Sequence, residues 1–160
     1  DDDALEDVEF DVEVLGSIEA ANREGTLDGL EFYATSLVLE GKTTIRHYFK
    51  VTNENAVNVF KFDDSVLKAE RKDGTSFIYV DIKDIPAHEM DKIHTITVND
   101  TYTVSFSPLN YAKIVIETQS DIKLINLIKA MVNYYIEAED YNLHANAPTP
   151  GDNESDPSIW

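Results

Sequence analysis

The last third of the chain carries its strongest periodic pattern of hydrophobic and polar residues. Between Ser120 and Tyr141 apolar residues recur every three or four positions, while lysines, asparagines and a glutamate fill the opposite side of a helical wheel. The apolar arc consists of Leu124, Leu127, Ile128, Met131, Tyr135 and Ala138, widened by Ile125, Val132 and Ile136. The pattern predicts a long amphipathic helix that buries this arc against a large apolar partner, for which a sheet is the natural choice.

Upstream of this segment the period shortens to about two residues, which is typical of β-strands. The clearest example is Thr43–Val51, in which Ile45, His47, Phe49 and Val51 alternate with polar residues, so we expect these four side chains to face the core. Similar patterns predict strands over residues 8–15, 30–40, 43–51, 57–62, 66–70, 77–82, 94–98 and 102–106.

Turn and capping residues separate these elements. Asn99-Asp100 is typical of a two-residue hairpin loop, and the segment Gly16 to Gly29 is predicted to be a loop. Ser107-Pro108 begins a short helix, because the serine hydroxyl can cap free N–H groups and the fixed φ of proline suits a first turn. Ser120-Asp121 begins the long helix with a second cap and an acid near the positive end of its dipole.

The order of these elements predicts the fold class. Strands precede helices and no strand–helix–strand alternation occurs, so we expect an α+β fold: an antiparallel β-sheet or small β-sandwich of roughly six to eight strands, with two C-terminal helices packed on one face or end. Residues 8–141 are predicted to form a single globular β-rich domain. Residues 1–7 are interpreted as a frayed acidic N-terminus, and residues 142–160 as a polar, proline-containing linker or tail.

Composition excludes several classes of function. The 31 acidic and 13 basic side chains give a net charge of −18, which argues against binding to nucleic acids and to anionic membrane surfaces. The chain has no cysteine, so it has no disulfides, thiolate zinc sites or cysteine nucleophile. No apolar run reaches the ~18 residues of a membrane span. His88-Glu89 begins like a zinc-protease motif, but Lys92 stands where the second histidine is needed.

The remaining candidates for catalysis are acidic pairs. Asp81 with Asp84, or Glu70 with Asp73, can be proposed as a glycosidase pair. In a chain this acidic such pairs arise by chance, so we predict no catalytic residue, no metal site and no cofactor.

Calcium is the one ion that the sequence leaves open. Asp63-Asp64 and Asn99-Asp100-Thr101 offer oxygen ligands, but neither follows the regular spacing of a calcium loop. Turn residues that hydrogen-bond to their own backbone are the simpler interpretation of both segments.

The best candidate for ligand binding is the outer face of the strand Thr43–Val51. Arg46 and Tyr48 project from it together, beside Phe77 or Tyr79 of another strand. Arginine and tyrosine are common at recognition surfaces, and aromatic rings stack on sugars. The competing interpretation, which we favour, is that the long helix covers this face and packs on Tyr48, Phe77 and Tyr79.

Four segments together resemble a known type of module. They are SLVLEGKTTIRHYFKV, FIYVDIKDIPAHEMDK, ITVNDTYTVSFSPLNYAKIVI and LINLIKAMVNYYIEAEDY, and they span Leu30 to Tyr141. In this order they resemble an uncharacterised module that recurs near the C-termini of large secreted and surface proteins of Clostridia-type anaerobes. The resemblance implies an exported, multidomain parent protein associated with a Gram-positive cell wall or surface. It implies no known activity and assigns no functional residue.

These observations favour a non-catalytic extracellular module that serves as a spacer, stabilising or adhesion unit of a larger bacterial protein. The alternative is a carbohydrate-binding module that uses the aromatic sheet face. A third hypothesis is a module whose sheet edge or helix face docks on another domain of the same parent. The expected partners are neighbouring domains, a glycan or a host protein.

Overall fold

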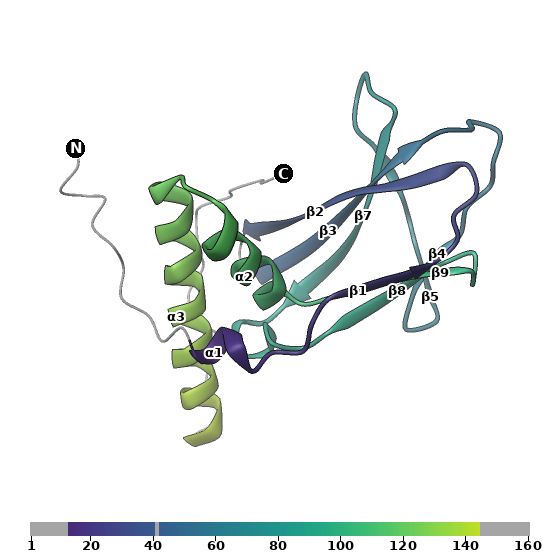
Figure 1. Ribbon diagram of the computed structural model, residues 1–160. Coiled ribbons are helices and arrows are strands. Elements are labelled where there is room, and N and C mark those ends of the chain that lie inside the picture. Colours follow the sequence, from purple (N-terminus) through teal and green to yellow (C-terminus); the bar gives the residue numbers. More distant parts are fainter. Residues whose placement is uncertain (1–12, 41, 145–160) are drawn as a thin grey trace.

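The computed structural model of the chain describes residues 13–40 and 42–144, which form two antiparallel β-sheets with helices at one end (Figure 1). One sheet has five strands in the order β1-β9-β8-β4-β5 and the other has four in the order β2-β3-β7-β6. The strands are β1 Asn22–Gly25, β2 Leu30–Glu40, β3 Lys42–Val51, β4 Phe60–Phe62, β5 Ser65–Leu67, β6 Glu70–Arg71, β7 Phe77–Ile85, β8 His94–Val98 and β9 Tyr102–Phe106. The helices are α1 Glu13–Gly16, the short 3-10 helix η2 Ala87–Glu89, α2 Pro108–Thr118 and α3 Ile122–His144. The predicted α+β fold is confirmed.

The hydrophobic core lies between the inner faces of the two sheets. Ile45, His47 and Phe49 of β3 are fully buried, as the alternation in this strand predicted. The five-stranded sheet contributes residues such as Phe60 and Val98, and the rings of Phe49 and Phe60 lie 5.3 Å apart. Strands such as β8 and β9 bury alternate residues, which is why their period of two was readable in the sequence.

The hairpin of β8 and β9 forms as predicted. Asn99 and Asp100 have φ values of 54° and 58°, the left-handed conformation that a type I′ turn requires at both central positions. The side-chain oxygen of Asn99 accepts a hydrogen bond of 2.7 Å from the backbone N–H of Val59. The turn therefore also holds the chain just before β4.

A buried capping box begins α2. The N–H of Asn110 donates to Oγ of Ser107 over 3.1 Å, and the N–H of Ser107 donates to Oδ1 of Asn110 over 2.7 Å. The Asn110 amide also donates to the carbonyl of Glu19, so one side chain joins the helix start to the N-terminal segment. The predicted helix start at Ser107-Pro108 is confirmed.

The long helix α3 begins and ends slightly later than predicted. It runs from Ile122 to His144, and Asp121 caps it by accepting a hydrogen bond from the N–H of Lys123. Within its apolar arc Ile128, Met131, Val132 and Ala138 are buried. Leu127 is only partly buried, so it lies nearer the margin of the arc than we expected.

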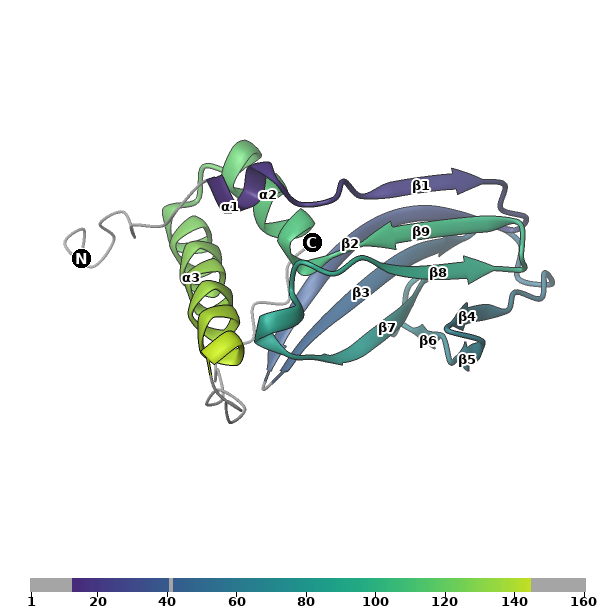
Figure 2. The ribbon, with the colours of Figure 1, turned by 90° about the horizontal axis from the view of Figure 1, so that it is seen from below.

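The position of α3 contradicts the expectation that it covers a sheet face. Helix α3 packs against α2 and η2 at one end of the sandwich (Figure 2). Helix α2 leaves β9 at that end, and the short connection 119–121 keeps α3 next to α2. Tyr48, Phe77 and Tyr79 therefore do not lie beneath the helix.

The N-terminal predictions were wrong where the structure describes them. Glu13–Gly16 is a helical turn instead of part of a strand, and residues 8–12 lie outside the described residues. The predicted loop contains β1, a short edge strand whose four residues are all exposed and so show no alternation. Gly25 ends this strand with a φ of 106°, and a Cβ there would lie 2.1 Å from the carbonyl oxygen of Thr101.

Two other strand boundaries also differ from the prediction. The strand expected over 57–62 begins only at Phe60, because Val57 and Val59 are exposed rather than core residues. The strand expected over 66–70 is divided between β5 and β6, which belong to different sheets. The predicted tail from residue 142 includes the last turn of α3, and residues 145–160 lie outside the described residues.

We expect the substitution Met131→Asp to destabilise the chain by roughly 4 kcal/mol, because it buries a charge without a partner. Met131→Leu, which keeps the volume and the apolar character, should cost less than about 1.5 kcal/mol. Urea unfolding followed by circular dichroism measures both. Equal stability of the Asp and Leu variants would show that this face of α3 is not part of the core.

Candidate functional site

The structure brings the four predicted site residues together on the outer face of the four-stranded sheet. In the register of β3 and β7, Arg46 stands opposite Asp81, Tyr48 opposite Tyr79, and Lys50 opposite Phe77. The antiparallel pairing places Arg46, Tyr48, Phe77 and Tyr79 on one side of the sheet. The proximity inferred from the sequence is therefore confirmed, whereas a role in binding remains a prediction.

Arg46 is the centre of this outer-face cluster. Its Nε and Nη2 atoms donate to the two carboxylate oxygens of Asp81 over 2.8 and 3.0 Å, and its guanidinium lies 4.2 Å above the ring of Tyr79. The hydrogen bond to Asp81 raises the pKa of Arg46 above its usual value. The ion pair also explains why Asp81 is not an available acid: its carboxylate already neutralises Arg46.

The aromatic rings of this face are tilted against one another. Tyr48 is only 4% exposed, and its ring makes an angle of 59° with that of Tyr79. Tyr33 lies 4.5 Å from Phe77 at an angle of 52° and is 54% exposed. The sequence did not predict Tyr33 here, because it sits at the register shift between Phe32 and Ala34 in β2. Tilted rings do not form one flat stacking platform.

A second candidate site, which the sequence analysis missed, is a groove of about 740 Å³ at the open side of the sandwich. It lies between β1 and β2, the edge strands of the two sheets, and is bounded by α2 and the start of α3. Its lining is mainly apolar and aromatic, and includes Phe32, Thr35, Tyr102, Val104, Phe106, Tyr111, Ile114, Val115 and Leu124. The volume falls within the range of about 300–1,000 Å³ that is usual for ligand pockets.

Arg23 places a cation at the mouth of this groove. In the pairing of β1 with β9 it stands opposite Val104, whose side chain is buried between the sheets, so Arg23 also faces inward. Its guanidinium lies 4.2 Å from the centroid of the Phe32 ring, across the gap between the two edge strands. The next residue, Glu24, accepts a hydrogen bond from the amide of Asn22 instead.

His47 lies directly behind the wall of the groove. Its Nδ1 is 2.7 Å from Oγ1 of Thr35, and its ring lies against Phe106 and Phe32, all three of which line the groove. Burial lowers the pKa of His47 to about 3, so the ring is neutral at physiological pH. Its Nε2 has no hydrogen-bond partner within the described part of the chain. His47 therefore adds no charge behind the wall of the groove.

The segments considered for calcium are turns. Asp63 and Asp64 both have positive φ values, of 50° and 66°, and the side-chain oxygen of Asn99 already accepts a backbone hydrogen bond. Across residues 13–40 and 42–144, no three histidine or acidic side chains gather in a way that could hold a metal ion. Among the helices in these ranges, none combines the length and apolar character that a membrane span requires.

No family model, curated protein or solved structure matches the chain. The outer-face cluster and the groove are the two candidate sites that the described residues form. In the first, the charges neutralise one another. In the second, an apolar space is open and a cation stands at its mouth.

We expect His47 to remain neutral until the pH falls to about 3, although an unfolded histidine titrates near about 6.5. Between these values the unfolded chain binds one more proton than the folded chain, so the free energy of unfolding decreases as the pH falls below about 6.5. NMR titration of the imidazole resonances, with urea unfolding at pH 6.5 and 5, measures both effects. Titration of His47 near pH 6.5 in the folded chain would contradict its burial.

Proposed function

We propose that the chain is a non-catalytic binding module of a larger secreted or surface protein, and that it holds its ligand in the groove between β1 and β2. The observation that carries this proposal is the groove of about 740 Å³, open to solvent between two edge strands and lined mainly by apolar and aromatic side chains. Concave, mostly apolar sites with a few polar groups are the usual form of a binding site.

The ionisable groups near the groove support a role in binding without catalysis. A general acid or base works best when its pKa lies near the working pH, but the pKa of His47 is lowered to about 3. Thr35 and Phe106 also stand between His47 and the groove. Glu24 is exposed, and its carboxylate accepts a hydrogen bond from the amide of Asn22.

The proposed setting is the bacterial cell surface. The net charge of −18 suits an exposed, solvated module and opposes contact with nucleic acids or anionic lipids. The resemblance of residues 30–141 to a module of exported clostridial proteins supports the same setting. Neighbouring domains of the parent protein are then further partners, and the module serves in adhesion or stabilisation through the ligand that it holds.

Fragment screening by NMR tests the groove. Small aliphatic and aromatic fragments should shift the amide resonances of Arg23, Phe32 and Thr35, and Ile114→Glu should abolish these shifts. Ile114 is 48% exposed, so the variant should fold while it places a carboxylate at an apolar wall. Val57→Glu is the matched control, because Val57 is 86% exposed and does not line the groove.

Two results would contradict the proposal. Fragment shifts of the same size in the Ile114→Glu variant would show that the groove is not the binding site. Turnover of any substrate in a panel of glycans and peptides by the unmodified chain would show that the module is catalytic.

The alternative function is carbohydrate binding at the outer-face cluster. One observation favours it: Tyr33 is 54% exposed and, with Phe77, forms an aromatic pair on the sheet face that carries Arg46 and Tyr79. Exposed aromatic pairs can stack on sugar rings even without a flat platform. The groove remains the better supported site, because the recess of about 450 Å³ that Tyr79 and Asp81 help to line on the outer face is smaller than the groove of about 740 Å³.

For this alternative, Tyr33→Ala should weaken binding to any glycan found on an array by at least about fivefold, as truncation of an aromatic anchor does. Isothermal titration calorimetry gives the affinities. Ile114→Glu, which changes the groove and leaves the outer face intact, should bind the same glycan as the unmodified chain. Glycan binding that is lost in Ile114→Glu and kept in Tyr33→Ala would exclude the outer face.

A further inference from the structure

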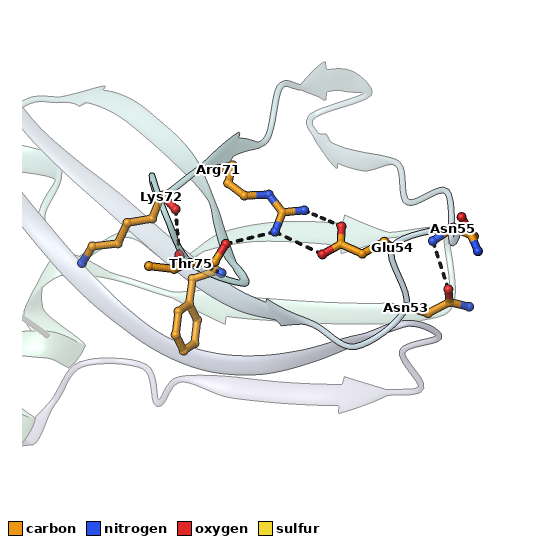
Figure 3. A network of polar contacts seen from close by, with 7 residues as sticks. Asn53, Glu54, Asn55, Arg71, Lys72 and Thr75 are labelled. Carbon is orange, nitrogen blue, oxygen red and sulfur yellow. Dashed lines mark hydrogen bonds and ion pairs between the residues drawn. The ribbon is translucent and has the colours of Figure 1, made fainter.

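The chain contains three arginines, and they differ in how their charge is neutralised. Arg46 forms its bidentate ion pair with Asp81. Arg71 pairs with Glu54, its Nη2 lying 2.6 Å from Oε1, and also donates to the carbonyl of Thr75 (Figure 3). Arg23, at the mouth of the groove, has no carboxylate within ion-pair distance among the described residues.

The environment of Arg23 leaves its hydrogen-bond donors available. The guanidinium carbon of Arg23 lies 4.2 Å from the centroid of the Phe32 ring, a cation–π contact that engages no oxygen acceptor. The N–H groups point outward in the plane of the guanidinium, in the forked arrangement that matches the two oxygens of a carboxylate. Arg46 and Arg71 each pair with a carboxylate, so Arg23, which pairs with none in the described structure, is the exception among the three arginines.

The space behind Arg23 is lined mainly by apolar side chains, and Glu24, Ser105 and Gln119 are polar groups in the same lining. Val104 and Phe106 of β9 and Val115 of α2 line it and are buried, and Leu124 of α3 bounds it at the helical end. The hydroxyl of Thr35, a polar group in this wall, is already engaged by His47. A complementary ligand therefore has an apolar body and one anionic group at one end.

The edge of β2 argues against a peptide strand as the occupant. Strand addition needs an evenly spaced row of free N–H and C=O groups. The pairing of β2 with β3 shifts between Phe32 and Ala34, beside the groove, and such irregularities re-aim the edge of a strand. The inward-facing charge of Arg23 on β1 protects the opposite edge in the same way. Side-chain chemistry, and not backbone pairing, is what the groove offers.

We infer that the groove binds a small amphiphilic carboxylate, with its hydrocarbon or aromatic body between the sheets and its carboxylate on the guanidinium of Arg23. This inference rests on the proposed function and names the class of its ligand. The acidic surface as a whole opposes an anion only weakly, because salt largely screens charges that lie more than about 8 Å away at physiological ionic strength. At the site itself, hydrogen bonds between the ligand's carboxylate and the guanidinium of Arg23 outweigh this repulsion.

The test uses laurate, which carries a carboxylate, and dodecanol, which has the same hydrocarbon chain without the charge. Calorimetry and NMR titration with the full 160-residue chain should show laurate in the groove. Arg23→Gln should weaken laurate binding by about tenfold, as expected for the loss of a charged hydrogen-bond partner. Dodecanol should bind the unmodified chain and Arg23→Gln equally.

Two further variants test whether laurate binding depends on the guanidinium of Arg23 itself or only on the net charge of the chain. Arg71→Gln removes the same charge from an arginine that lies outside the groove, and it should bind laurate as the unmodified chain does. Arg23→Lys keeps the charge without the fork and should retain part of the affinity. An unchanged melting temperature of Arg23→Gln would show that its weaker binding is not due to unfolding.

The possible failures are distinguishable. Equal laurate binding by Arg23→Gln and the unmodified chain overturns the inference. The inference is also overturned if laurate does not bind below its micelle concentration while neutral fragments still occupy the groove. That result would leave the proposed function standing. Binding of an extended apolar peptide in place of laurate overturns the inference as well, and identifies a strand as the occupant. If nothing occupies the groove, both proposals fail.

Discussion

The buried capping box of Ser107 and Asn110 directs the chain as it leaves the sandwich, and the positions of the helices follow from it. Its two reciprocal hydrogen bonds begin α2 at the end of β9, and the third bond, to the carbonyl of Glu19, joins this start to the N-terminal segment. Helix α3 then packs on α2 and η2 and not on a sheet. Because the helices occupy one end, the outer sheet face stays uncovered and the groove stays open.

The two candidate sites show how the surroundings of an arginine determine what it can do. Arg46 stands in the middle of a sheet face, where the register places Asp81 directly opposite, so cross-strand pairing neutralises it. Arg23 stands on an edge strand opposite Val104, which offers no charge. Its guanidinium instead contacts Phe32 on the other sheet. The first arginine stabilises the fold, and the second is available to a ligand.

The groove is a consequence of an open β-sandwich. Strands β1 and β2 are the edges of their sheets on the same side, and no strand of the described chain joins them. An open edge carries a risk of aggregation, which natural sheets reduce with inward charges and irregular pairing. Both devices occur here, as Arg23 and as the register shift beside Tyr33. The residues that protect the edges thus also shape the mouth of the groove.

The sequence by itself determined the elements whose pattern is local. The alternation in β3, the Asn99-Asp100 turn, the serine cap of α2 and the apolar arc of α3 each depend on residues a few positions apart, so the periodicity and the turn chemistry were sufficient. That Arg46 and Tyr48 share a face was also inferable, since both lie on one strand, whereas their position beside Phe77 and Tyr79 depends on the pairing of β3 with β7. The tertiary structure alone decided the rest. Strand β1 exists because β9 pairs with it, and α3 lies at the end because α2 holds it there. The groove joins residues of β1 and β2 to residues of β9, α2 and α3 from much later in the chain. No local pattern encodes such contacts, because they depend on how complete sheets and helices pack.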